Sequence, residues 1–382
     1  MKKNRIIIFL VGFLFTIPLA ITSYINSSFL ETFLNKYYIG IVYIVASIIA
    51  IIGLLEMPRI LNRFGNRFTT LLFSFTGFIS LLALALGTKG YIIIPAIVVY
   101  FISTDMIIAS LDIFIEDFSK SGNVGKFRGL YLMVINFSWI VAQMVSGSII
   151  EKSSFRGIYL FSAIFVFLVS VVFILFLRDF KDPKYIKMPI LKTIKVFIKN
   201  KSLSKIYSIN LILKFFFAWM VIYTPIYLHE YLGFNWENIG LIFTIMLIPY
   251  VLIDYPLGRL SDKIGEKKLL LIGFLITIVF TLIMPLISLP IVWLWALILF
   301  GTRVGASVVE VMAESYFFKE VSERNPDEIS FFRNTYPLSF VIAPLVAIPV
   351  LLIVPSFKYL FFVLGAITLL GFLITLRLKD VK

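Results

Sequence analysis

The chain has 382 residues, of which 60% are hydrophobic and only 15% are charged, and its formal net charge is +14. Soluble domains are on average about 45–50% apolar and about 25% charged, so this composition excludes both a water-soluble globule and a disordered chain. The absence of Cys also excludes disulfides, thiolate catalysis and iron–sulfur ligation.

Apolar segments long enough to cross a membrane follow one another along the whole chain. A transmembrane helix needs about 20 apolar residues to cross a hydrocarbon core of roughly 30 Å. Charged residues or clusters of Gly, Pro and Asn separate these segments. The segments are 6–26, 38–57, 68–88, 91–116, 128–150, 156–177, 206–230, 238–258, 268–287, 289–314, 332–354 and 358–376. The sequence therefore predicts an all-α polytopic membrane protein with twelve transmembrane helices.

One long connection, residues 178–205, divides the predicted helices into two sets of six. It separates an N-terminal bundle, residues 1–177, from a C-terminal bundle, residues 206–382, and carries nine Lys and Arg. Lys192, Lys195 and Lys199 recur in it at helical spacing. This spacing predicts an amphipathic helix on an anionic membrane surface, with a solvated linker as the alternative.

The basic residues are distributed unevenly between the two sides of the predicted membrane. With the N-terminus inside, 28 Lys and Arg lie in inner segments and five in outer segments. By the positive-inside rule, both termini are cytoplasmic and the protein is a multi-pass protein of the cytoplasmic membrane. The positive net charge is therefore explained by the basic residues of the inner segments, and we expect no nucleic-acid partner.

The two sets of six helices carry an internal repeat. Several residues of the first half recur 200 positions later in the second half. The matches are Asn35 with Asn235, Ile39–Gly40 with Ile239–Gly240, Arg59 with Arg259 and Gly65 with Gly265. Other positions match at an offset of 198, with identical or different residues. The matches are Thr104 with Thr302, Asp105 with Arg303, Asp112 with Glu310 and Glu116 with Glu314. The chain is therefore expected to form two pseudo-symmetric six-helix bundles in the same orientation.

The loop between the eighth and ninth predicted helices reads GRLSDKIGEKK. It resembles the loop signature of the major facilitator superfamily in seven residues: Gly258, Arg259, Asp262, Lys263, Gly265, Lys267 and Lys268. The first half keeps Arg63, Gly65 and Arg67 but has Pro58 for the leading Gly and Asn62 for the Asp. An inner latch that relies on this carboxylate is therefore in question for the first half.

Three charged residues lie deep within predicted helices. A charge at the bilayer centre costs about 2.5–3.5 kcal/mol on insertion scales, so such residues usually face the bundle interior. Asp105 lies about 14 residues, or roughly 21 Å, from the outer end of 91–116, and Arg303 reaches the same depth in 289–314. The resemblance implies a central cavity lined by the first and fourth helices of each half. Asp105, Arg303 and Lys214 are accordingly candidate substrate or coupling residues; a structural ion pair and a snorkelling Lys are the alternatives.

A second group of charged residues approaches the predicted inner rim. Residues at i, i+7 and i+11 share one helical face. One stripe is therefore formed by Asp105, Asp112 and Glu116, and another by Arg303, Glu310 and Glu314. We expect this group to form inner-gate salt bridges, with direct proton carriage as the alternative. Its members are Asp112, Glu116, Arg128, Asp254, Glu310, Glu314 and Arg333.

The aromatic residues of 206–230 and the single His allow two interpretations each. The aromatic residues can line a pocket for an amphipathic solute or can serve lipid contact and packing. They are Phe215, Phe216, Phe217, Trp219, Tyr223 and Tyr227. His229 can take part in proton coupling or lie exposed at the outer membrane interface.

The resemblance implies a secondary active transporter that works by alternating access and is coupled to protons or to another ion. Efflux of amphipathic compounds and uptake of a polar or anionic metabolite both remain open, as do a non-transporting receptor or sensor and a lipid-handling protein. No nucleotide-binding loop or catalytic cluster occurs, so we expect no enzyme, cofactor or metal site. The expected partners are a small-molecule substrate, the coupling ion and membrane lipids, and we expect a monomer.

Overall fold

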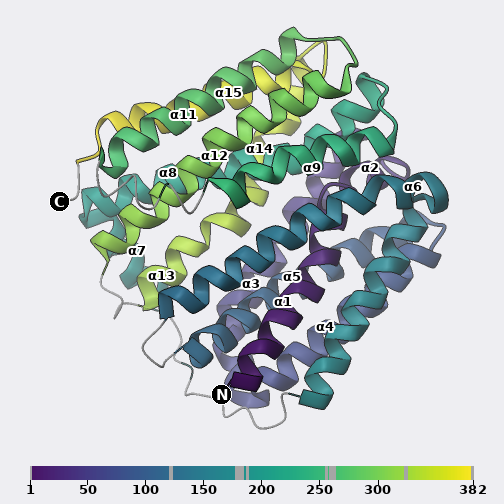
Figure 1. Ribbon diagram of the computed structural model, residues 1–382, viewed down its shortest axis with the longest axis vertical. Helices are drawn as coiled ribbons and strands as arrows, with labels where there is room; N and C mark the ends of the chain where they lie inside the picture. The colour runs from purple at the N-terminus through teal and green to yellow at the C-terminus, as the bar shows by residue number, and fades with distance from the viewer. Residues whose placement is uncertain are drawn as a thin grey trace. The chain divides into compact units, whose positions relative to one another are not determined.

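A computed structural model describes residues 2–119, 124–176, 185, 189–253, 257, 264–321 and 326–379. Within these residues every regular element is a helix, as predicted (Figure 1). The chain forms two compact units. The first contains Met1–Lys187 with Asn235–Gly240, and the second contains Met188–Phe234 with Leu241–Lys382. The second unit thus begins inside the predicted linker.

Among its described residues, the first unit contains six helices and the first residues of α9. The six helices are α1 (Lys2–Ser23), α2 (Asn26–Glu31), α3 (Lys36–Phe64), α4 (Asn66–Leu86), α5 (Gly90–Ser119) and α6 (Val124–Phe176). Helix α1 packs on α6, α4 packs on both α5 and α6, and α3 packs on α5. Helix α6 is broken at Ser154, whose φ of 56° is outside the helical range. The break falls between the predicted helices 128–150 and 156–177.

The second unit contains the remaining helices, apart from the first residues of α9. They are α7 (Ile190–Lys199), α8 (Lys201–Ile226), the π-helix η1 (Tyr227–Tyr231), α9 (Trp236–Leu252), α11 (Glu266–Ile283), the 3₁₀ turn η2 (Met284–Leu286), α12 (Val292–Glu320), α13 (Pro326–Arg333), α14 (Thr335–Ile353) and α15 (Tyr359–Leu376). Helix α11 packs on α12 and α15, and α8 packs on α12, α14 and α15.

Ten helical segments in the described part of the chain are long and apolar enough to cross a membrane. One of them, Met133–Phe176, has 44 residues and includes the break at Ser154, so its length suffices for two crossings. Helix α9 has 17 residues, and residues 254–256 after it lie outside the described residues. The all-helical membrane fold is confirmed, whereas the number of twelve helices stays a prediction.

The backbone repeats the pattern that the sequence showed at an offset of 200. The side chain of Asn35 accepts a hydrogen bond from Tyr37 N at the start of α3, and that of Asn235 accepts one from Asn238 N at the start of α9. Gly65 and Gly265 have φ values of 78° and 87° and immediately precede α4 and α11. A positive φ is open to Gly at little cost, which explains the residue at both turns.

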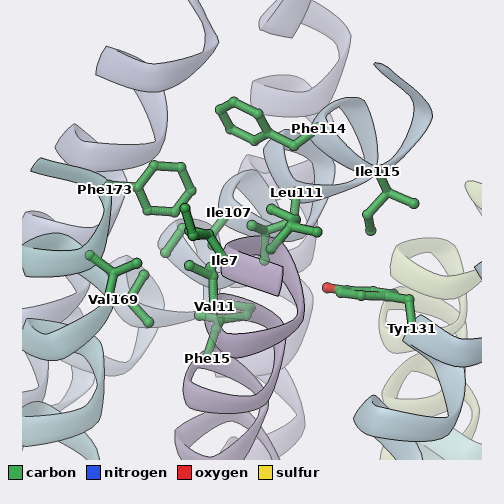
Figure 2. Packing of buried hydrophobic residues seen from close by; sticks show 12 residues of the cluster. Ile7, Val11, Phe15, Ile107, Leu111, Phe114, Ile115, Tyr131, Val169 and Phe173 are labelled. Atoms are coloured by element: carbon green, nitrogen blue, oxygen red, sulfur yellow. The ribbon is translucent and has the colours of Figure 1, made fainter. Parts of the chain in front are cut away.

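An apolar cluster holds α1, α5 and α6 together (Figure 2). Ile7, Val11 and Phe15 recur every four residues and lie on one face of α1. They pack in a cluster that includes Phe114 of α5 and Phe173 of α6, whose rings lie 5.4 Å apart. This cluster fixes α5, the helix that carries Asp105.

In the second unit, α11 and α12 approach closely through glycine. A Cβ atom added at Gly305 would lie 2.5 Å from the carbonyl oxygen of Gly273 and 2.4 Å from Oγ1 of Thr277. Without a large interhelical hydrophobic driving force, membrane helices associate through such small-residue contacts. The contact fixes α12, the helix that carries Arg303 and Glu310.

Candidate functional site

Asp105 lies on α5 within a row of polar side chains. It is 8% exposed, and among the described residues its Oδ2 has no hydrogen-bond partner. The hydroxyl of Ser103 pairs with that of Thr76 on α4 at 2.9 Å. Thr104 Oγ1 donates to the carbonyl oxygen of Tyr100 at 2.9 Å. An ionisable residue that is buried in a membrane helix is a candidate functional residue by default.

Arg303 lies on α12 in the second unit and is 1% exposed. Its guanidinium carbon lies 5.4 Å from the ring centroid of Phe216 and 5.4 Å from that of Phe217, both on α8. A cation within about 6 Å of an aromatic centroid is attracted by the ring quadrupole, by about 2 kcal/mol or more where it is desolvated. The two rings therefore help to keep a positive charge in a buried position.

Lys214 of α8 forms an ion pair with Glu310 of α12. The two side chains are 16% and 27% exposed. The ammonium nitrogen of Lys214 also lies 5.3 Å from the ring centroid of Phe217. Phe217 is therefore within cation–π distance of both Lys214 and Arg303, and its ring centroid lies 6.2 Å from that of Tyr250 on α9.

This cluster of Lys214, Phe217, Arg303 and Glu310 joins residues that the sequence placed in two groups. Lys214 and Arg303 were assigned to the cavity and Glu310 to the inner gate. Arg303 and Glu310 are seven residues apart on α12, so they share a face as predicted. Whether Asp105 pairs with Arg303 stays a prediction, because the two residues belong to different units.

The other predicted inner-gate residues have varied environments. Asp112 is half-buried and interacts electrostatically with Tyr131. Glu314 is more exposed and interacts electrostatically with Lys214. Arg333 is exposed at the end of α13. The side chains of Glu116 and Arg128, and the whole of Asp254, lie outside the described residues.

In the second half, four residues of the loop motif lie outside the described residues: Gly258, Arg259, Asp262 and Lys263. Gly265 forms the turn before α11, and Lys267 and Lys268 lie in the first turn of that helix.

In the first half, the corresponding residues hold neighbouring backbone in place. Arg67 donates hydrogen bonds to the carbonyl oxygens of Phe173 and Ile174 near the end of α6. Arg63 lies over the ring of Phe64, 5.1 Å from its centroid.

Asn62 stands where the resemblance would place an Asp. Its Nδ2 donates to the carbonyl oxygen of Tyr185 at 2.7 Å, and its Oδ1 accepts from Tyr185 N at 3.2 Å. A carboxylate could accept but not donate, so this two-way contact requires an amide. The departure from the motif therefore has a structural use.

Glu266 is a buried carboxylate that the sequence reasoning missed. It is 1% exposed, and its Oε1 accepts from Ser315 at 3.0 Å and lies 2.5 Å from Nζ of Lys319. The internal repeat could have pointed to this residue, because Glu266 corresponds to Asn66 at an offset of 200. Asn66 is also buried and donates to the carbonyl oxygen of Ser110 at 3.0 Å.

The aromatic residues of α8 are mostly packed. Trp219 is fully buried, and its ring lies 5.3 Å from that of Phe215 and 5.4 Å from that of Tyr223. These contacts favour the packing interpretation for this face. His229 lies in η1, where its Nδ1 is 2.8 Å from the carbonyl oxygen of Phe234 and its side chain is 35% exposed.

The comparisons with known proteins agree with this architecture. A sequence profile described as Major Facilitator Superfamily matches residues 6–309 and 212–382. The chain belongs to this superfamily. It is a multi-pass membrane protein with the superfamily's helical fold.

A curated relative aligns with part of this superfamily member. Over 127 residues it is 26% identical to the multidrug efflux pump SdrM of Staphylococcus aureus (strain N315). The aligned region is 33% of this chain and 28% of the pump. The pump's activity and substrates are therefore not transferred to the chain by this match.

Proposed function

We propose that the protein is a secondary transporter that moves a small solute by alternating access and uses a proton gradient. The observation that carries the proposal is the burial of ionisable residues at matching positions of the two halves, Asp105 on α5 and Arg303 on α12. Superfamily membership supports transport, and a carboxylate in a membrane helix supplies a titratable group.

The cluster around Phe217 supports a coupling role for the second half as well. Glu310 forms an ion pair with Lys214. In this proposal Asp105 is the titratable group, while Lys214, Arg303 and Glu310 set the charge around Phe217. The gate residues Asp112, Glu116, Arg128, Asp254, Glu314 and Arg333 form and break salt bridges as the two halves move.

For the substrate we propose an amphipathic compound that is exported. The relative named as a multidrug efflux pump and the aromatic rings of α8 support this choice. Uptake of a polar or anionic metabolite is the second candidate, since Lys214 and Arg303 are two cations in one buried region.

Proton flux in vesicles tests the proposal. Purified protein is reconstituted in vesicles that contain a pH-sensitive dye, and a panel of amphipathic compounds and of polar metabolites is added. A compound-dependent proton flux that protein-free vesicles lack supports the proposal, and the responding class decides between the two substrates. Specific binding without flux of any compound would overturn it in favour of a receptor. Lipid transfer without solute flux would favour a lipid-handling protein.

We further propose that the protein lies in the cytoplasmic membrane as a monomer, with both termini in the cytoplasm. The bias of basic residues toward the inner segments supports this orientation. Because the chain has no Cys, single Cys residues placed at either terminus can be labelled from one side of the membrane without background. Labelling of either terminus from the outside of intact cells would overturn the orientation.

A further inference from the structure

Helix α7 lies directly before the membrane-spanning helix α8. A single residue, Asn200, separates them, and its Oδ1 accepts hydrogen bonds from Ser202 N at 2.9 Å and Leu203 N at 3.3 Å. This cap fixes the start of α8, so α7 is connected directly to one end of the membrane-spanning helix.

One face of α7 packs against α8 and α13 within the second unit. Phe197 is 4% exposed, and its ring lies 4.8 Å from that of Phe331 on α13 and 5.6 Å from that of Tyr207 on α8. Thr193, one turn before Phe197, is 3% exposed. This face cannot also contact lipid, so any membrane contact must involve the rest of the helix.

The rest of α7 combines aliphatic and basic side chains. Leu191 and Ile198 are 78% and 71% exposed, and they share one side of the helix because they are seven residues apart. At about 100° per residue, the exposed side chains of Lys192, Lys195 and Lys199 follow next to them, on the side away from Phe197. Two large aliphatic side chains beside three ammonium groups form an amphipathic surface.

We propose that this surface, Leu191, Ile198, Lys192, Lys195 and Lys199, binds anionic phospholipids of the membrane leaflet into which α8 runs. The three ammonium groups contact the phosphates, while Leu191 and Ile198 enter the boundary with the acyl chains. The charge is complementary to anionic headgroups, and the continuity with α8 holds the surface at headgroup depth. The inference rests on the membrane fold and does not depend on the proposed transport.

A spin label tests the depth of the helix. The chain has no Cys, so Leu191→Cys gives one labelling site in the full-length protein. The labelled protein is reconstituted in phosphatidylcholine vesicles with or without phosphatidylglycerol, and the label's accessibility to oxygen and to a water-soluble nickel chelate is compared. We expect the label to be lipid-immersed in the anionic vesicles and nearer to water in the neutral vesicles.

Substitutions of the three lysines test whether lipid binding requires their positive charges. Lys192→Gln, Lys195→Gln and Lys199→Gln in combination should weaken phosphatidylglycerol enrichment around the protein by about tenfold or more, given the gain per Lys at an anionic surface. The corresponding three Lys→Arg changes should preserve it. As a matched control, Lys267→Gln with Lys268→Gln on α11 should leave the label at residue 191 immersed.

Two results would overturn the proposal. One is a label whose accessibility to the nickel chelate is the same in both kinds of vesicle, because the position of the helix then does not depend on anionic lipid. The other is an unchanged phosphatidylglycerol enrichment in the triple Gln variant. An unchanged thermal midpoint of that variant ensures that a loss of lipid contact is not a loss of fold.

Discussion

Lys214 of α8 and Glu310 of α12 form an ion pair within the second unit, beside the ring of Phe217. The pair joins two membrane-spanning helices, and both side chains are largely withdrawn from solvent. A buried charge without a partner destabilises a folded protein more than a buried pair of opposite charges does. Removing one partner of this pair should therefore lower the stability of the protein.

We expect Lys214→Gln or Glu310→Gln alone to lower stability more than the double change. Each single change leaves one member of the pair charged without its partner in a poorly solvated region, whereas the double change removes both charges of the pair. The coupling energy should be about 1–3 kcal/mol, below the cost of breaking a fully buried pair because these side chains keep some exposure. Thermal unfolding in detergent, arranged as a double-mutant cycle, measures it.

The pair of Glu56 and Arg59 on α3 offers a matched control, since its side chains are 37% and 69% exposed. Exposed ion pairs contribute about 0–1 kcal/mol, so Glu56→Gln should barely change the unfolding midpoint. Strictly additive effects of Lys214→Gln and Glu310→Gln would show that the two residues are not energetically coupled.

A second prediction concerns the turns that the internal repeat places before α4 and α11. Gly65→Ala and Gly265→Ala should each destabilise the protein by a similar amount, about 1–3 kcal/mol. The φ values of 78° and 87° with ψ near 150° form a region that is open essentially to Gly. The fall in the thermal unfolding midpoint in detergent, compared between the two variants, measures this cost.

Gly90→Ala is the control for the glycine variants. Gly90 begins α5, and a Cβ atom there would lie at ordinary contact distances of 3.8 Å from Phe33 and 3.9 Å from Ile94. The change should be neutral or slightly stabilising because Ala is the better helix former. If Gly90→Ala lowered the thermal unfolding midpoint as much as Gly65→Ala does, the backbone conformation of Gly65 would not be the cause of its destabilisation.

Much of the fold was predictable because its signals are local. Apolar length gives the membrane helices, and the recurrence of Asn35 and Gly65 as Asn235 and Gly265 anticipates the same caps and turns in both halves. The break at Ser154 was predictable from the charged segment between two apolar ones. The number of crossings stays a prediction, because α9 is short and residues 254–256 after it lie outside the described residues.

The pairing of the site residues could not be predicted from the sequence, and their depth in the membrane stays a prediction. Counting residues along a helix predicts the level of Asp105, Lys214 and Arg303, but it does not give the rotation of one helix against another. Lys214 therefore meets Glu310 through the packing of α8 on α12, which no local pattern reports. Glu266 was missed for a similar reason, since its burial depends on Ser315 and Lys319 of α12.

A third prediction tests Asp105 as the carrier of the coupling proton. Asp105→Asn should reduce gradient-driven transport to the level of protein-free vesicles but preserve counterflow, because exchange of substrate across the membrane requires no net proton movement. Asp105→Glu, which keeps a carboxylate, should retain part of the driven transport. The measurement compares uptake driven by a pH gradient with exchange at equal pH. Full pH-driven transport by Asp105→Asn would remove Asp105 from the coupling mechanism.

The last prediction concerns the charges at matching positions of the two halves, Asp105 and Arg303. If they attract each other during the transport cycle, the exchange of Asp105→Arg with Arg303→Asp should retain more transport than Asp105→Asn or Arg303→Gln alone, because the exchange preserves opposite charges. Arg303→Gln also loses the contacts with Phe216 and Phe217, so its thermal midpoint must be measured with its transport rate. An equal loss of transport in the exchange and in both single variants, with folding intact, would show that each charge acts independently of the other.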